Sequence, residues 1–125
     1  NMLKQVSDFI NITLNGEPQS TNNIYRSHCR FGFPSVYMSA NGKTLKTDYQ
    51  WQIKSQYHGK PIKGDIKMKV DLYLGTKRKQ DIDNFNKILY DSLTGILYID
   101  DSQIIEVLTR KLYDPKSPRI ELFII

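Results

Sequence analysis

The sequence predicts one small domain of mixed α and β structure, an α/β (α+β) fold in which two helices pack on a mixed β-sheet. Its 125 residues are 39% hydrophobic and 25% charged, which is ordinary for a globular protein, so we expect residues 1–125 to form a single domain. Apolar residues recur with helical spacing in two segments and alternate with polar residues in several others. Because strands flank the helical segments along the chain, we expect the helices to pack on the sheet.

The first strand is expected over residues 9–15, where Ile10, Ile12 and Leu14 alternate with polar side chains. Gly16 ends this strand, and a polar loop is expected to follow it. A short strand is expected at 36–38, between two turn signals, Phe33-Pro34 and Asn41-Gly42.

Two amphipathic helices are predicted next. The first runs from Thr44 to near His58-Gly59, because apolar residues recur at every fourth position, at Leu45, Tyr49, Ile53 and Tyr57. The second is expected to have Asp81 as its N-cap and to end at Gly95. Its apolar stripe consists of Ile82, Phe85, Ile88, Leu89 and Leu93.

Three further strands complete the prediction. Residues 65–74 alternate most regularly, with apolar side chains from Ile66 to Leu74 on one face and Lys67, Lys69, Asp71 and Tyr73 on the other. Residues 104–113 and 119–125 are the other two strands, and the turn between them contains Asp114-Pro115 and Ser117-Pro118.

Composition narrows the classes of partner. The formal net charge is +5, which favours an anionic partner, although many small proteins are basic without a specific reason. Cys29 is the only cysteine, so no intrachain disulfide can form, which fits a reducing cytoplasm. No apolar run approaches the roughly 20 residues of a membrane span. Neither a phosphate-binding loop nor a dinucleotide fingerprint occurs, so no nucleotide cofactor is expected.

Carboxylates concentrate at two places, Asp81 with Asp83 and Asp100 with Asp101. Close carboxylates repel one another unless a cation neutralises them, and hard oxygen ligands suit Mg²⁺ or Mn²⁺. Each acid also has an ordinary explanation, since acids favour helix starts and Asp83 with Lys87 has the spacing of a surface ion pair. Asp100 and Asp101 add two carboxylates that no helix rule requires, which favours a metal site.

Cations surround the acidic segment. Lys77, Arg78 and Lys79 directly precede it, and further candidates for contact with a nucleic-acid backbone are Arg26, Arg30, Lys43 and Lys46. The alternative is that the run at 77–79 merely protects a strand edge from pairing. Trp51 lies outside the stripe of the first helix, so an interface role and a core role both stay open.

These residues together resemble the RusA family of Holliday junction resolvases, small endodeoxyribonucleases often carried by prophages. The family pattern D-x-D-N-x-x-K, D-x-L, G, D-D-x-Q-[IV] is matched by Asp81 to Lys87, Asp91 to Gly95 and Asp100 to Ile104. The segment Ser20-Thr21-Asn22-Asn23-Ile24-Tyr25-Arg26 is similar to another family segment after the first strand. The resemblance therefore covers most of the domain.

The resemblance implies a function and a set of roles. Asp81, Asp83 and Asp101 fall on the family's metal-binding aspartates, Lys87 falls on its essential lysine, and Asp100 is an adjacent carboxylate. It also implies Mg²⁺ (or Mn²⁺), a homodimer, and four-way DNA junctions as substrate in the cytoplasm of a bacterial or phage-infected cell. Gln80 departs from the family, which often has arginine immediately before the first aspartate.

The sequence therefore predicts a dimeric, metal-dependent endonuclease that resolves Holliday junctions by paired nicks. One alternative is a non-catalytic protein that binds branched DNA, whose acids only cap a helix. Another is a related nuclease that acts on flaps or replication forks.

Overall fold

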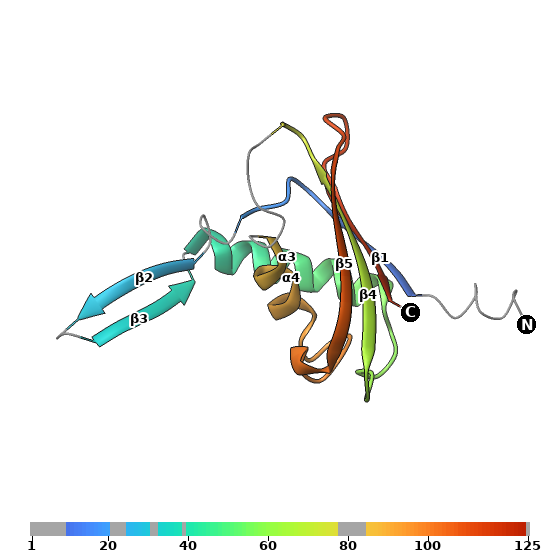
Figure 1. The fold of residues 1–125 in the computed structure, drawn as a ribbon, viewed down its shortest axis with the longest axis horizontal. Helices are drawn as coiled ribbons and strands as arrows, with labels where there is room; N and C mark the ends of the chain where they lie inside the picture. Colours follow the sequence, from blue (N-terminus) through green and yellow to red (C-terminus); the bar gives the residue numbers. More distant parts are fainter. Residues whose placement is uncertain (1–9, 21–24, 31–32, 39, 78–84, 125) are drawn as a thin grey trace, which may run out of the picture.

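The computed structural model describes residues 10–20, 25–30, 33–38, 40–77 and 85–124. Six strands, two α-helices and one short 3-10 helix lie in this part of the chain (Figure 1). In chain order they are β1 (Ile10–Asn15), β2 (Tyr25–Arg30), β3 (Phe33–Met38), α3 (Ala40–Gln56), β4 (Ile66–Leu74), α4 (Asn86–Leu93), η2 (Asp101–Gln103), β5 (Ile104–Tyr113) and β6 (Arg119–Ile124).

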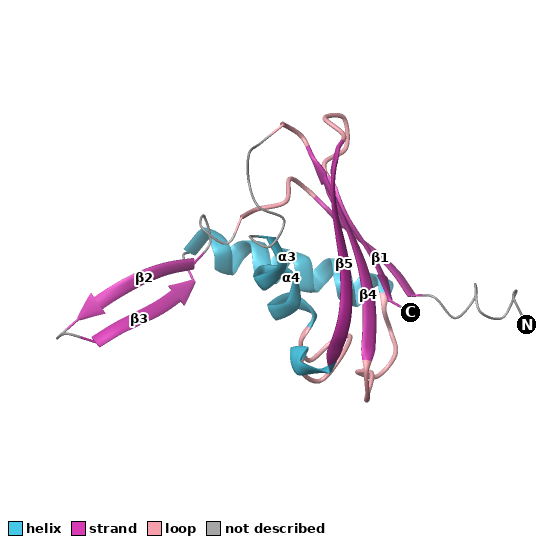
Figure 2. Ribbon diagram, viewed as in Figure 1, coloured by secondary structure: helices cyan, strands magenta, loops and turns pink. Residues whose placement is uncertain are grey.

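The main sheet has four strands in the order β1-β6-β4-β5. β6 pairs antiparallel with both β1 and β4, whereas β5 pairs parallel with β4. The parallel pair requires a crossover, which α4 and the segment after it provide. The mixed sheet with two helices confirms the predicted fold class, and Figure 2 shows α3 and α4 on the same face of the sheet.

The prediction of a single sheet was wrong, because β2 and β3 form a separate two-stranded antiparallel sheet. This hairpin projects from the body of the molecule beside the start of α3 (Figure 1). The expected loop before residue 30 is instead β2, and the expected turn at Phe33-Pro34 is the start of β3. Proline is tolerated at the start of a strand, where a missing N–H does least harm.

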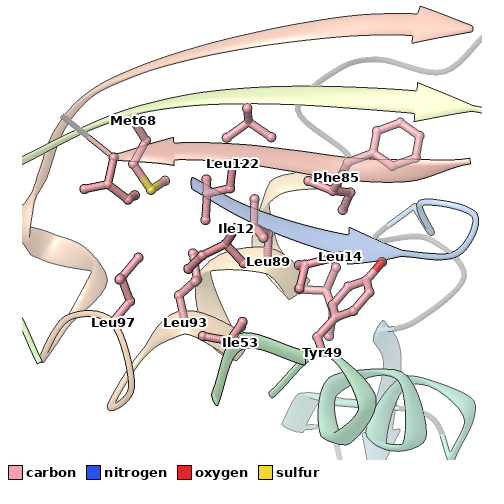
Figure 3. Packing of buried hydrophobic residues seen from close by; sticks show 14 of the residues in the cluster. Ile12, Leu14, Tyr49, Ile53, Met68, Phe85, Leu89, Leu93, Leu97 and Leu122 are labelled. Carbon is pink, nitrogen blue, oxygen red and sulfur yellow. The ribbon is translucent and has the colours of Figure 1, made fainter. Parts of the chain in front are cut away.

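The core lies between the main sheet and the two helices (Figure 3). Alternate residues of β4 face it, as the strand pattern predicts, together with Ile12 and Leu14 of β1 and with Ile120 and Leu122 of β6. The helices contribute Tyr49 and Ile53 from α3 and Ile88, Leu89 and Leu93 from α4. The apolar stripes read from the sequence are therefore the faces that the helices bury.

The first helix begins four residues earlier than predicted, at Ala40 rather than Thr44. The expected turn at Asn41-Gly42 lies inside its first turn, and Gly42 is buried there. A glycine at such a position weakens a helix in isolation, so tertiary packing rather than local propensity fixes this end.

The second helix begins later than predicted. The residue at the N-cap position of α4 is Phe85, which makes no side-chain capping bond and whose ring is buried. Asp81, the predicted N-cap, lies outside the described part of the chain together with the rest of residues 78–84. A buried aromatic side chain, not a capping carboxylate, anchors this helix start in the core.

The outer edge of β1 is covered by two glutamine side chains of α3. The amide of Gln56 accepts a hydrogen bond from the Thr13 N–H at 2.8 Å and donates one to the Thr13 carbonyl at 2.7 Å. Gln52 does the same with Asn15, at 2.7 Å and 3.4 Å. Each amide therefore pairs with β1 as the peptide group of a further strand would.

In the part that the structure describes, no helix is long and apolar enough to cross a membrane.

Candidate metal and nucleic-acid site

The chain that follows α4 is held tightly against the end of that helix. Gly95 has a φ of 85°, a left-handed conformation that glycine adopts without strain. The Tyr90 carbonyl accepts three hydrogen bonds, from the Thr94 N–H at 3.1 Å, the Thr94 hydroxyl at 2.8 Å and the Tyr98 hydroxyl at 2.9 Å. This network fixes the path of the chain into η2, where the second pair of carboxylates lies.

Tyr98 connects α4 with the Asp100-Asp101 segment electrostatically. Its ring is fully buried, and burial is the main reason why the pKa of its hydroxyl is raised. The hydrogen bond with Thr94 lowers this pKa, whereas the charges of Asp101 and Asp91 raise it further. Both carboxylates therefore lie near the same hydroxyl. Asp101 therefore lies near Tyr98, whose hydroxyl donates a hydrogen bond to the Tyr90 carbonyl of α4.

Asp100 and Gln103 form a reciprocal cap on η2. The Asp100 carboxylate accepts a hydrogen bond from the Ser102 N–H at 3.2 Å. The Gln103 side-chain oxygen accepts from the N–H groups of Ile99 at 2.8 Å and of Asp100 at 2.9 Å. The pKa of Asp100 is lowered, first by a hydrogen bond with the Ser102 side chain and then by the one from the Ser102 N–H. Asp100 thus has a structural task in this turn, and Asp101 is left exposed beside it.

Gln103 also attaches this turn to a second loop. Its side-chain amide donates hydrogen bonds to the carbonyls of Ile62 and Gly64, both at 2.8 Å. One side chain therefore uses its acceptor and its donor to hold two loops together at the start of β5. In the sequence, Gln103 stands out only as part of the family motif, without a role. The spacing of an acidic cap followed three residues later by glutamine is the signal that could have revealed it.

Lys87 lies on α4 and its ammonium group is 4.0 Å from the Asp91 carboxylate, one helical turn away. Asp83, which has the same spacing from Lys87 in the other direction, lies outside the described residues. The ion pair gives Asp91, matched above only to the family pattern, a pairing role on α4. Both side chains are partly exposed, so this pair orients Lys87 more than it stabilises the fold.

The predicted metal ligands Asp81 and Asp83 lie outside the described part of the chain, so their approach to Asp101 stays a prediction. Among the residues that are described, no three acid, histidine or cysteine side chains lie close enough to hold a metal ion. Asn86, at the start of α4, has a buried side-chain oxygen without a hydrogen-bond partner in the same part of the chain. Carboxylate and amide oxygens are the donors that Mg²⁺ and Mn²⁺ accept, so the residue types in and beside this segment fit such an ion.

A basic hollow lies where β4 and β5 end. Its volume is about 370 Å³, and it is lined by Leu74, Thr76, Lys77, Lys111, Leu112 and Tyr113. The ammonium group of Lys77 lies 5.5 Å from the centre of the Tyr113 ring. Lys77 is exposed, and the structure adds Lys111 and Tyr113, which the sequence did not single out because they lie 34 and 36 residues further along the chain. Arg78 and Lys79 lie outside the described residues.

The other predicted DNA contacts lie on different elements. Arg26 and Arg30 belong to β2, in the projecting hairpin, while Lys43 and Lys46 lie in the first half of α3. A second hollow, with a volume of about 410 Å³, lies on α3 and is lined by Lys43, Thr44, Thr47, Asp48 and Trp51. Trp51 is 69% exposed, which excludes the core role that the sequence left open. The predicted cations therefore do not form one patch on a single element.

Comparison with known proteins agrees with this picture. The family model for the endodeoxyribonuclease RusA matches residues 15–125. The crossover junction endodeoxyribonuclease RusA of Escherichia coli strain K12 is 28% identical over 108 residues, which cover 86% of this chain and 87% of that protein. The enzyme of the same name from Enterobacteria phage 82 has the same identity and coverage.

An uncharacterised protein of Bacillus subtilis strain 168, YqaN, is 28% identical over 139 residues, covering 94% of this chain and 96% of that protein. The match of the family model extends from the end of β1 through every later element, including the acidic motifs and the Gln103 turn. The chain belongs to the RusA endodeoxyribonuclease family.

Proposed function

We propose that this protein is a Mg²⁺-dependent (or Mn²⁺-dependent) endonuclease that resolves four-way DNA junctions, and that it acts as a homodimer. The observation that carries the proposal is the family match over residues 15–125, which includes both acidic motifs. The geometry of η2 supports it, since the Gln103 contacts hold Asp101 exposed beside α4.

Asp81, Asp83 and Asp101 are the proposed metal ligands. The chemistry that bound Mg²⁺ supplies is polarisation of the scissile phosphate and a lower pKa for the attacking water. The chain's own contribution is to position charge. Lys87, oriented by Asp91, is proposed to contact the phosphate as a point cation, and Lys77 and Lys111 to contact the neighbouring backbone. Tyr113 offers an exposed ring on which a base can stack.

The proposed dimer follows from the substrate. Resolution of a four-way junction needs cuts in two strands of like polarity, and a two-fold axis supplies two equivalent sites for them. A single subunit with one site would release after one nick and leave the junction unresolved.

A nicking assay on a fixed synthetic junction tests the proposal. Asp101→Asn should lower the cleavage rate at least about 100-fold while junction binding is unchanged or tighter, because a negative charge near phosphate is removed. Asp100→Asn is the matched control, since asparagine also caps a helix and should retain most of the activity. Activity should be lost in EDTA.

Other outcomes would replace the proposal. A wild-type protein that binds junctions without nicking them in Mg²⁺ or Mn²⁺ would be a binding protein. Faster cleavage of flaps or three-way forks than of four-way junctions would identify a related nuclease. Equal loss of activity in Asp100→Asn and Asp101→Asn would mean that the turn as a whole, not the Asp101 carboxylate, is required.

A further inference from the structure

The edge of the sheet at β5 is long, apolar and open. β5 has ten residues and pairs only with β4, so its other side faces no strand in the described part of the chain. Leu108 is 57% exposed and Ile105 56%, and Val107 and Tyr113 are also among the large apolar residues left exposed. Such an edge is a template for pairing with another strand unless something blocks it. At the opposite edge, β1, the glutamines of α3 block it.

The charges of β5 lie in register with opposite charges of β4. Glu106 stands opposite Lys67 and Arg110 opposite Asp71, with Leu108 midway between the two pairs. The Lys67 ammonium group is 3.8 Å from the Glu106 carboxylate. Arg110 binds Asp71 through two hydrogen bonds of 2.8 and 2.9 Å. All four side chains lie on the face of the sheet that the helices leave uncovered, because the alternate residues of β4 face the core.

We propose that β5 is the interface between two copies of this chain, paired antiparallel about a two-fold axis at Leu108. In a two-fold pair the same strand supplies both sides, so each contact occurs twice. With the axis at Leu108, Glu106 of one copy stands opposite Arg110 of the other, and Leu108 stands opposite its own equivalent. The inference rests on the dimer proposed above and identifies its surface.

This register makes the charges alternate across the whole joined sheet. One row reads Lys67, Glu106, then Arg110 and Asp71 of the second copy, which is positive, negative, positive, negative. The symmetry-related row is the same in reverse. Opposite charges directly across two strands stabilise their pairing, whereas like charges oppose it. Arg110 and Glu106 are both partly exposed in the single chain, so each can serve a second partner.

Neighbouring registers lose this complementarity. Residues that face each other across an antiparallel pair share a face, so the axis can move only in whole-residue steps along the strand. With the axis at Val107, Glu106 meets Leu108, and with the axis at Thr109, Arg110 meets Leu108. Both place a charge against an apolar side chain. A register shift between Ile66 and Lys67 interrupts the regular strand before Glu106, so the pairing is expected over residues 106–110.

The arrangement has a consequence for the two proposed active sites. The two-fold axis stands perpendicular to the joined sheet, so the helices of both copies lie on the same face. The two β5 strands begin at Ile104, four residues before the axis, so their starts are about 26 Å apart at roughly 3.3 Å per residue. The two η2 turns with their Asp101 residues would therefore face the same side of the dimer.

Disulfide trapping tests the register. Leu108→Cys in a Cys29→Ser background should form a covalent dimer under mild oxidation, because directly opposed strand residues lie within disulfide reach. Glu106→Cys in the same background is the matched control. Its equivalents are offset by four residues, about 13 Å, and should not crosslink. Crosslinking at position 106 and not at 108 would overturn the register.

Sizing by light scattering separates the failure of this interface from the failure of the dimer. Wild type should be a dimer, and Leu108→Lys a monomer with unchanged circular dichroism. Trp51→Lys, at a more exposed apolar residue on α3, should be a dimer. If wild type is a monomer, the proposed dimer fails with the interface. If Leu108→Lys is still dimeric, or Trp51→Lys is the monomeric variant, the dimer stands but uses another surface.

Discussion

The two edges of the main sheet differ, because side chains of α3 hydrogen-bond to the outer side of β1 whereas no described strand pairs with the outer side of β5. At β1, the side-chain amides of Gln52 and Gln56 bind the outward N–H and carbonyl groups of Thr13 and Asn15. At β5, no strand or helix covers the edge in the described part of the chain, and exposed apolar residues alternate there with charges. An unpaired edge is a risk for uncontrolled association, so closing one edge and leaving the other open directs association to a single strand.

The β1 edge also shows that side-chain amides can make the hydrogen bonds that the backbone of a neighbouring strand would otherwise make. A glutamine amide carries one acceptor and one donor group in the geometry of a peptide, so it can pair with a strand residue as a neighbouring strand would. The helix that supplies these amides is fixed by Tyr49 and Ile53 in the core. Closure of the β1 edge therefore depends on tertiary packing of α3, whereas the β5 edge is open because no described strand pairs with its outer side.

Opening the closed edge is expected to have the largest effect. Gln52→Ala with Gln56→Ala removes four exposed hydrogen bonds, each worth roughly 0.5 kcal/mol, so the free energy of unfolding should fall by about 2 kcal/mol. Urea unfolding measures this loss. Gln50→Ala on the same helix is the control and should change little. A double variant as stable as wild type would show that water replaces the glutamines without cost.

Breaking the ion pair between Asp71 of β4 and Arg110 of β5 should have the next largest effect. Asp71 is only 3% exposed, although strand alternation places it on the solvent side, and its partner Arg110 is half exposed. We expect Asp71→Asn to lower the free energy of unfolding by about 1.5 kcal/mol at pH 7, the low end for a hydrogen bond to a charged group. It should also loosen β5 and weaken the proposed dimer.

The pH dependence of that loss has a defined sign. The hydrogen bonds from Arg110 hold the pKa of Asp71 below its ordinary value of 3.8, against the opposing effect of burial. Because the pKa of this carboxyl is lower in the folded than in the unfolded state, ionised Asp71 stabilises the fold at pH values above its unfolded-state pKa. This stabilisation is lost as the pH falls through the folded-state pKa. The difference in stability between wild type and Asp71→Asn should therefore be full at pH 7 and shrink below about pH 4. A difference that persists unchanged at pH 2.5 would contradict an ionised Asp71.

The smallest effect is expected for the exposed ion pair between Lys67 of β4 and Glu106 of β5. Lys67 and Glu106 are both more than half exposed and 3.8 Å apart. Lys67→Ala should change the free energy of unfolding of the single chain by less than about 0.5 kcal/mol, because water screens such pairs. A loss above 1 kcal/mol in a dilute, monomeric sample would mean that the open edge is more constrained than its exposure indicates.

Much of the fold could be predicted from local patterns. β4, β5 and β6 were predicted to within a residue or so, because alternation and turn residues mark their bounds. The described residues of both apolar stripes pack in or against the core, since an amphipathic helix buries its apolar face. The start of α3 at Ala40 and the start of α4 at Asn86 could not be predicted, because packing of Gly42 and Phe85 overrides the local signals.

For the candidate site, too, the residues could be predicted from the sequence but their contacts could not. The motif residues Lys87, Asp100, Asp101 and Gln103 could be singled out in the sequence, since their types and spacing indicate the chemistry. Their contacts could not. The Gln103 bonds to Ile62 and Gly64 join residues about 40 positions apart, and Lys111 and Tyr113 reach Lys77 only because β4 and β5 run parallel.

The sequence by itself determined most of the elements, the buried faces, the family and the candidate site residues, because these follow from periodicity and from side-chain type. Only the tertiary structure decided which edge of the sheet is closed, that Asp71 is buried against Arg110, and that Glu106 and Arg110 flank Leu108 in register with opposite charges. The physical reason is that hydrogen bonds and ion pairs act over a few ångströms. Their partners are therefore chosen by the packing of segments that lie far apart in the chain.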